Sequence, residues 1–404
     1  MNLLFVADGR SPTAANWISH FTGGPHEVHL VSTFDCRPLP GLASFEQVSV
    51  AFSGMRRSSQ PGGRLTVQPF APDTEWIQWR TRVRDWIGPV TLGPAARRLR
   101  EIVDSCQPDL VHALRIPFEG MLAAAADPGA PLLISCWGND FTLHAVANPL
   151  IGRQTRTTLS KADGLLSDCQ RDLRLARQWG FPAERDAIVL PGSGGVRTDI
   201  FHPGNPLEGM DGSPLALVLE SLPPGSPVVV NPRGLRTYVR NDTFFAAIPR
   251  VLGKVPQARF LCPAMAGRRL PGTWLQDPAV SSAVRLLPRL SQAGMAAVFR
   301  RSAVVVSPSE HDGTPNTLLE GMACGSYPIA GDLESVREWI DDGVNGRLFD
   351  PQDPQALADA IVEALRERPM RSRAARQNIH MIEARAERGK VMAQAEGFYR
   401  RWLA

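Results

Sequence analysis

The chain has 404 residues, of which 43% are hydrophobic and 21% charged, with 44 Lys+Arg against 40 Asp+Glu. This length predicts two domains, and the apolar fraction suffices for two cores, which excludes a largely disordered chain. The formal net charge of +4 is too small for the basic surface that a nucleic-acid-binding protein needs, so we expect no nucleic-acid partner.

The cysteines and the apolar runs favour a cytoplasmic protein. The six cysteines are scattered without a C-x-x-C pair, which is typical neither of a zinc site nor of a secreted disulfide scaffold. No apolar run approaches the roughly 18 residues that a membrane span requires. The chain opens as MNLLFVAD, without the basic lead of a signal peptide.

Short apolar runs separated by helical patterns predict a parallel sheet in residues 1–190. We expect its strands at 3–7, 28–32, 110–112, 131–136, 164–167 and 187–190. Strands that alternate with helices imply right-handed crossovers and a doubly wound α/β domain.

Residues 75–90 (EWIQWRTRVRDWIGPV) predict an amphipathic helix. Trp76, Trp79 and Trp86 fall at helical spacing, with arginines interleaved. Such a helix can lie in a bilayer interface, or it can pack the same face on its own domain. Both interpretations stay open, so peripheral membrane contact is one expectation.

A second pattern of the same kind follows a segment rich in Gly and Pro. Residues 191–227 (PGSGG, FHPGNP, SLPPGSP) predict a linker between domains. Strands are then expected at 228–230, 260–262, 284–287, 304–306 and 328–330. These strands make 228–385 a second α/β domain. We expect a C-terminal helix over 386–404 that crosses back to the first domain. Ligands of such sheets bind beyond the carboxyl ends of the strands, and we expect the site in a cleft between the two domains.

The common phosphate and metal motifs are absent from the sequence. Gly192-Ser193-Gly194-Gly195 lacks the third glycine of a dinucleotide fingerprint, and no Walker loop occurs. There is also no Asp-x-Asp pair to hold a divalent cation, so we expect no metal and no cofactor.

Residues 307–323 are the most informative segment. The strand at 304–306 leads into a Pro/Gly loop and then into a helix near Asn316, which leaves helix-start N–H groups free to bind an anion. Asp312 in the loop and Glu320 in the helix can accept hydrogen bonds from hydroxyl groups on either side of a diphosphate. The alternative is an ordinary helix start, with Asn316 as the cap and Glu320 solvated.

The run SPSEHDGTPNTLLEGMACGSYPIA resembles the donor-site signature of glycosyltransferase family 4, retaining sugar-nucleotide enzymes with the GT-B fold. The hallmark is an acid, seven residues and a second acid, here Asp312 and Glu320. The segments PGSGGVRTDIFHPG, DLESVREWIDDGVNGRLFDPQDPQALADAI and MNLLFVADGRSPTAANWISHFTGGPHEVHLVS are also similar to this family. The resemblance implies two Rossmann-like domains that face a central cleft.

The resemblance implies a role for each matching residue of the donor domain, 228–385. Glu320 would bind the ribose hydroxyls and Asp312 the transferred sugar. The backbone of Gly313, Thr314, Pro315, Asn316 and Thr317 would hold the sugar and the distal phosphate, and the loop with Pro288, Arg289 and Leu290 would face the nucleobase. Arg233 and Arg240 look like the family's pair of phosphate-binding cations, although Arg236 could take the place of Arg240.

Three departures from the family pattern affect the predicted site. Asp312 is one methylene shorter than the usual Glu. Trp137 stands where many relatives have a His, and Asn139, Asp140 and His144 are expected on the acceptor side, in domain 1–190. The glycine pair that some relatives use near the first loop is absent, and this loop offers Gly9, Arg10 and Ser11 to the phosphates.

The resemblance predicts a hexosyltransferase-type glycosyltransferase that needs no metal and retains the configuration of the sugar. Its partners would be a nucleoside-diphosphate sugar and a saccharide or lipid-linked acceptor, in the synthesis of a polysaccharide, glycolipid or glycoconjugate. It would act in the cytoplasm or on the cytoplasmic face of the inner membrane. The alternatives are a GT-B phosphorylase or epimerase, or a catalytically silent sugar-nucleotide-binding protein.

Overall fold

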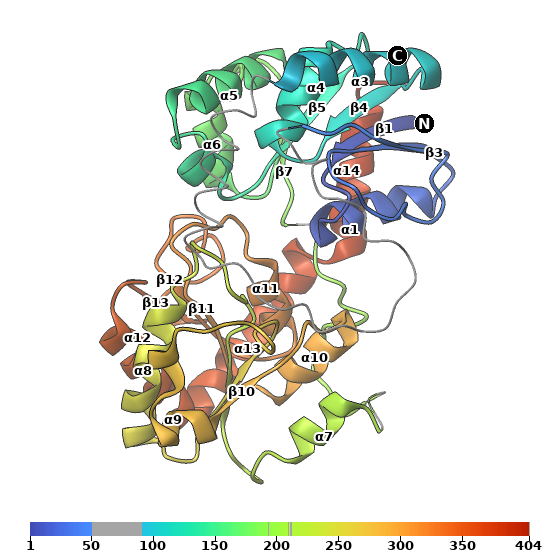
Figure 1. Cartoon of the computed structure of the whole chain (residues 1–404). Helices are drawn as coiled ribbons and strands as arrows, with labels where there is room; N and C mark the ends of the chain where they lie inside the picture. Colours follow the sequence, from blue (N-terminus) through green and yellow to red (C-terminus); the bar gives the residue numbers. More distant parts are fainter. Residues whose placement is uncertain (51–90, 193, 209, 211, 404) are drawn as a thin grey trace. The chain divides into compact units, whose positions relative to one another are not determined.

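The computed structural model describes residues 1–50, 91–192, 194–208, 210 and 212–403 (Figure 1). It divides into two compact units: residues 1–194 with 391–404, and residues 195–390. The segment 75–90, predicted as an amphipathic helix, lies outside the described residues. No helix within the described ranges is both long and apolar enough to cross a bilayer.

The first unit is built on a seven-stranded parallel sheet in the order β3-β2-β1-β4-β5-β6-β7. Its strands are β1 (Asn2–Ala7), β2 (Glu27–Ser32), β3 (Ser44–Gln47), β4 (Leu110–Ala113), β5 (Leu132–Cys136), β6 (Gly164–Ser167) and β7 (Ala187–Val189). Its helices are α1 (Pro12–Thr22), α3 (Leu92–Cys106), α4 (Met121–Ala126), α5 (Pro149–Lys161), α6 (Gln170–Gln178) and most of α14 (Arg388–Arg400), with one-turn segments η3 (Ile116–Gly120) and η4 (Asp140–His144).

Alternate residues of these strands face two separate cores, as a doubly wound sheet requires. Leu4 and Val6 of β1 pack with α3, α4 and α5 on one face. Leu3 and Phe5 pack with α1 and α14 on the other face. The apolar run at the start of the chain is therefore buried on both sides, which is why it shows no polar alternation.

The second unit is built on a six-stranded parallel sheet in the order β10-β9-β8-β11-β12-β13. Its strands are β8 (Val228–Val230), β9 (Arg259–Cys262), β10 (Val284–Leu286), β11 (Val304–Ser307), β12 (Tyr327–Gly331) and β13 (Arg347–Phe349). Its helices are α7 (Pro214–Glu220), α8 (Asn241–Lys254), α9 (Pro278–Ala283), α10 (Gln292–Arg301), α11 (Asn316–Ala323), α12 (Pro354–Arg366) and α13 (Arg368–Arg385), with a 3-10 turn η5 (Gly272–Leu275).

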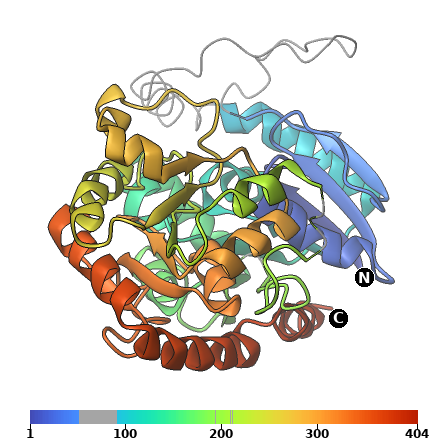
Figure 2. The ribbon, with the colours of Figure 1, turned by 90° about the horizontal axis from the view of Figure 1, so that it is seen from below.

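The second sheet also has a core on each face. Val304 and Val306 of β11 pack with α8, α9 and α12, whereas Val305 packs with α7, α10 and α11. Figure 2 gives a second view of the chain, with α12, α13 and α14 in red. The neighbours β8 and β11 are where the strand order reverses, so the loops that follow them diverge to opposite faces and leave a ligand position between them.

Every predicted strand is present, and the predictions missed only β3 and β13 among the described strands. Both are short edge strands whose residues are mostly half-buried, so they lack the apolar runs that identify the central strands. Most of the predicted linker 191–227 lies in the second unit. There Phe201 and Leu215 join the core beside β11.

Candidate functional site

Helix α11 carries Glu320 of the acid motif and packs closely against β11. At the contact point, α11 has a glycine, Gly321, and therefore no side chain. A Cβ at that position would lie 3.0 Å from the Val305 side chain, which is tighter than an ordinary contact, so any larger residue would require Val305 to shift. Helix α11 follows Pro315, its N-cap, and no side chain caps it. Asn316 is therefore the first helical residue and not the cap. The backbone N–H groups of Gly313 and Thr317 donate to no described group.

Arg233, after β8, reaches the loop after β11. Its Nη2 donates to Asp312 Oδ2 at 2.6 Å, and its Nη1 to Thr317 Oγ1 at 3.4 Å. The Arg233 side chain is only 8% exposed and that of Asp312 only 15%. The Nε atom of Arg233 is buried and has no partner in the described part of the chain. An unsatisfied buried N–H group is rare enough in proteins to indicate a missing ligand.

The Glu320 carboxylate lies one turn into α11 and makes no hydrogen bond or ion pair with any described residue. Burial raises its pKa to about 8, an effect that the nearby Arg233 charge only partly offsets. The site therefore combines a cation with a free donor and an acid with free acceptor capacity.

The raised pKa of Glu320 predicts a pH-dependent stability. The folded protein keeps the proton up to pH 8, whereas the unfolded chain releases it near the usual value of 4.5. The free energy of unfolding should therefore fall as the pH rises between these two values. Glu320→Gln, which cannot ionise, should raise the free energy of unfolding at pH 8 by on the order of 2 kcal/mol and leave it nearly unchanged at pH 4.

Urea denaturation at both pH values measures this effect, with Glu220→Gln on the exposed end of α7 as the control. A Glu320→Gln gain of the same size at both pH values would contradict the raised pKa.

The two other candidate arginines of the second unit lie apart from Asp312. Arg240 forms ion pairs with Asp242 at 2.7 Å and Glu310 at 2.8 Å. Hydrogen bonds to both carboxylates raise its pKa. Arg236 is exposed and donates to the hydroxyl of Tyr238 at 2.7 Å. Among the three arginines, only Arg233 contacts Asp312, whereas Arg240 reaches the same loop through Glu310.

The loop predicted to face a nucleobase follows β10, at the same end of the sheet. Its Leu287 is buried, and the carbonyl of Leu287 accepts hydrogen bonds from Met265 and Ala266. Pro288 and Arg289 are exposed, and Leu290 is half-buried. These side chains are accessible to a ligand.

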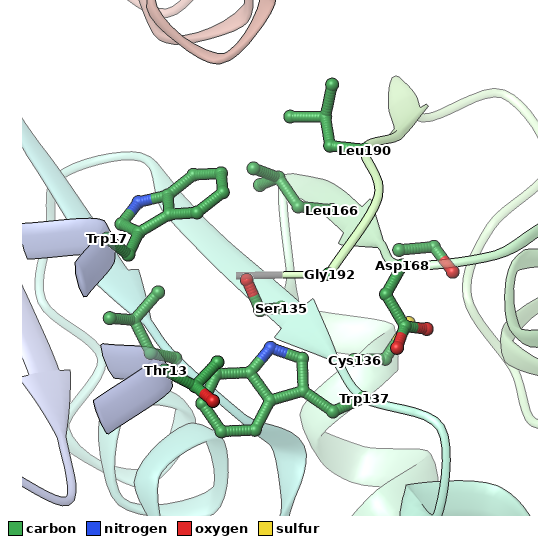
Figure 3. Close-up of a pocket in the computed structure, with 11 residues that line it drawn as sticks. Thr13, Trp17, Ser135, Cys136, Trp137, Leu166, Asp168, Leu190 and Gly192 are labelled. Carbon is green, nitrogen blue, oxygen red and sulfur yellow. The ribbon is translucent and has the colours of Figure 1, made fainter. Parts of the chain in front are cut away.

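The first unit has a pocket at the carboxyl ends of β4, β5, β6 and β7 (Figure 3). Figure 3 shows the ring of Trp137 at the lower edge of this pocket, with Ser135 between it and Leu166. Asp168, from the end of β6, lies on another side, and Thr13 and Trp17 come from α1. Hydroxyl groups, indole rings and a carboxylate therefore line the pocket.

Asp140 fixes the loop that presents Trp137. Its Oδ2 accepts the backbone N–H groups of Ile116 at 3.3 Å and Trp137 at 3.1 Å, and its Oδ1 accepts Arg115 Nε at 2.9 Å. Asp140 is only 1% exposed. Burial raises its pKa, and Arg115 opposes that effect.

The other residues predicted in the first unit, Asn139, His144 and Gly9, form hydrogen bonds within that unit. Asn139 Oδ1 accepts Arg115 Nη2 at 3.0 Å, and His144 ends η4, with its N–H on the Asn139 carbonyl. The N–H of Gly9 donates to Ser32 Oγ at 3.1 Å and is already satisfied.

Sequence reasoning missed a buried chain of hydrogen bonds beneath this pocket. The Tyr399 hydroxyl of α14 accepts Trp17 Nε1 at 2.9 Å and also contacts His112 Nδ1, while His112 Nε2 contacts Ser135 Oγ at 2.9 Å. Burial lowers the pKa of His112 to about 3, which keeps the ring neutral. The only advance signal was a histidine in the otherwise apolar strand 110–112.

One group of described residues has the spacing of metal ligands: Asp168, Cys169 and Asp172 in the first unit. Arg171 forms an ion pair with Asp172 at 2.6 Å and supplies the positive charge there. Because Arg171 already neutralises the Asp172 carboxylate, this group is better described as a buried ion pair than as a metal site.

Two family models match the chain. The model described as a glycosyl transferase 4-like domain matches residues 9–192, and the model described as glycosyl transferases group 1 matches residues 226–367. The D-inositol 3-phosphate glycosyltransferase of Frankia alni is 28% identical over 209 residues, which are 48% of this chain and 47% of that protein. The chain thus spans about half the length of the curated relatives that it first matches.

Solved structures resemble the chain over nearly its whole length. Sucrose-phosphate synthase from Thermosynechococcus elongatus has a TM-score of 0.72 at 15% identity and covers 99% of this chain and 98% of its own. Anabaena HepE in complex with UDP and glucose has a TM-score of 0.71 at 15% identity and covers 98% of this chain and 99% of its own. At these identities the similarity establishes the fold.

Proposed function

This chain belongs to the glycosyltransferases of family 4, with the GT-B fold, and from that premise we propose that it transfers a sugar from a nucleoside diphosphate to an acceptor hydroxyl group. The observation that carries the proposal is Arg233, which comes from the end of β8, is held against Asp312 in the loop after β11, and keeps one buried N–H group without a partner.

The second unit offers contacts for the diphosphate, the ribose and the base of a nucleotide sugar. Arg233 Nε and the N–H groups of Gly313 and Thr317 would bind the diphosphate, because they are donors without partners at the start of a helix. The unpaired Glu320 carboxylate would accept hydrogen bonds from the ribose hydroxyls. The accessible loop with Pro288 and Arg289 would contact the base.

Charge neutralisation on the leaving diphosphate is assigned mainly to Arg233. A bidentate guanidinium stabilises the negative charge that develops as the bond to the sugar breaks. Arg240 would first have to leave Asp242 and Glu310, so its contribution is expected to be smaller. With this cation built into the site, the proposed transfer requires no metal.

In the proposed reaction the bond between the anomeric carbon and the diphosphate oxygen breaks, and the acceptor oxygen forms a bond to that carbon. The acceptor proton passes to the departing diphosphate. Retention of configuration is part of the proposal and rests on the resemblance of the Asp312–Glu320 segment to retaining enzymes. The coupling constant of the anomeric proton in the product tests it.

The mouth of the first unit's pocket is proposed to contact the acceptor, a saccharide or a lipid-linked saccharide. The half-buried indole ring of Trp137 offers an apolar face on which a sugar ring can stack, and the half-buried Thr13 offers a hydroxyl group. Asp140 is proposed to act indirectly, by holding Trp137 in place. Contact with a membrane through 75–90 and a cytoplasmic site of action stay predictions from the sequence.

Thermal-shift binding of nucleoside diphosphates tests the donor site. We expect one of UDP, GDP, ADP, dTDP and CDP to stabilise the protein, with or without EDTA, by ~2.7 kcal/mol at 100 times its dissociation constant. Turnover is then measured with the matching sugar nucleotides. D-inositol 3-phosphate and phosphatidyl-myo-inositol serve as the first acceptors, because the names of curated relatives mention them.

The outcomes separate the proposed function from its alternatives. Binding without turnover on any acceptor favours a silent sugar-nucleotide-binding protein. No response to any nucleotide, together with no turnover of any sugar nucleotide, would overturn the donor site and favour phosphorylase chemistry. Stabilisation that EDTA abolishes would overturn only the metal-free part of the proposal.

A further inference from the structure

The carboxylate of Asp312 already has a strong partner in the ligand-free protein. The 2.6 Å contact with Arg233 Nη2 is a short, charge-assisted hydrogen bond between side chains that are 15% and 8% exposed. Water screens such a pair much less than it screens a pair at the surface. Any ligand that takes Arg233 away from Asp312 leaves a poorly solvated carboxylate without its counter-ion.

Phosphate binding by Arg233 engages the same nitrogen. A guanidinium grips a phosphate through two neighbouring N–H groups, either Nε with Nη2 or Nη1 with Nη2. Both edges include Nη2, the atom that Asp312 holds. Since Nε is the buried donor without a partner, the edge formed by Nε and Nη2 is the one prepared for a ligand. A phosphate there either displaces Asp312 or brings a second anion onto the same nitrogen.

We propose that Asp312 is a specificity-determining residue, which makes the site bind an intact sugar nucleotide in preference to the bare nucleoside diphosphate that transfer leaves behind. This inference rests on the proposed function. It assigns to Asp312 a role in the ligand-free and product states, in addition to the contact with the transferred sugar that the family resemblance implies.

The two ligands differ in the hydrogen bonds that they can donate to the Asp312 carboxylate. An intact donor carries sugar hydroxyl groups, which can donate hydrogen bonds to the carboxylate that has lost Arg233. A bare diphosphate offers no donor and, near neutral pH, adds more negative charge beside the same carboxylate. The product diphosphate is therefore repelled by the Asp312 carboxylate, whereas the sugar hydroxyl groups of the donor compensate for this repulsion. A repulsive contact of this kind is an effective source of specificity.

The test compares the dissociation constants of a product and its donor, UDP with UDP-glucose or GDP with GDP-mannose, by isothermal titration. In Asp312→Asn, an isosteric change that removes the charge, we expect the diphosphate to bind about 5- to 10-fold tighter and the sugar nucleotide about 5- to 10-fold more weakly. Asp312→Glu keeps the charge, so the ratio of the two constants should stay within about threefold of wild type.

Asp332→Asn is the control, because Asp332 also pairs with an arginine, Arg337, at 2.6 Å but follows β12 and lies outside the loop 308–315 that carries Asp312. It should change neither constant. If the wild type binds a nucleoside diphosphate and Asp312→Asn leaves the ratio of the two constants unchanged, or weakens both ligands alike, the inference is wrong and the proposed function stands. If the wild type binds none of these four ligands and no other nucleotide of the thermal-shift panel, the proposed function itself fails.

Discussion

Glu320→Ala is expected to lower kcat/KM for sugar transfer by at least about 100-fold. The carboxylate has no described partner and lies on α11 beside Arg233, so its hydrogen-bonding capacity is reserved for a ligand. Two hydrogen bonds to ribose hydroxyls, at ~1.5 kcal/mol each, correspond to a loss of about 3 kcal/mol, or roughly 100-fold. Steady-state kinetics with the donor and acceptor that give turnover in the wild type measure the loss.

The stability of this variant separates a functional loss from misfolding. Removing an acid whose pKa is raised by burial should not weaken the fold at pH 8, so the melting temperature should not fall below that of the wild type. Glu220→Ala, at the exposed end of α7, should keep full activity. Full turnover by Glu320→Ala would mean that Glu320 plays no part in the donor site.

Arg233→Ala is expected to weaken donor binding about 10-fold and to lower kcat about 100-fold. The guanidinium contributes to ground-state binding of the diphosphate, and more to the charge that develops as the diphosphate leaves. Arg233→Lys should recover only part of kcat, because an ammonium group cannot grip a phosphate through a planar pair of N–H groups. Titration of the donor and single-turnover kinetics separate binding from bond cleavage.

The arginine variants also decide which second cation the site uses. Arg240→Ala and Arg236→Ala should each have a much smaller effect than Arg233→Ala, since their guanidinium groups are held by Asp242 and Glu310 or by Tyr238. Arg337→Ala, which removes the ion pair with Asp332, should change neither donor binding nor kcat. Equal losses in Arg233→Ala and Arg337→Ala would contradict the role of Arg233.

Much of the fold could be predicted from the sequence, because local patterns determine it. The apolar runs 3–7 and 304–306 are short and continuous, which is typical of buried parallel strands, and both are interior strands of their sheets. The edge strands β3 and β13 escaped prediction because their short sequences, SFEQ and RLF, include polar residues and form no continuous apolar run.

The acid motif was predictable for the same reason. The spacing of Asp312 and Glu320 along the chain places one acid in the loop after a strand and the other one turn into the next helix. Which arginine meets that loop could not be read from spacing. Arg233 and Asp312 are 79 residues apart and meet because β8 and β11 are neighbours in the sheet.

The sequence alone thus determined the two α/β domains, the parallel strands and the position of the acid motif, because periodicity and local turn chemistry act between residues close in the chain. Only the tertiary structure decided that Arg233 rather than Arg240 or Arg236 pairs with Asp312, and that Tyr399 reaches His112, 287 residues away. These pairings depend on strand order and on burial. Both arise only when distant segments pack together and exclude water.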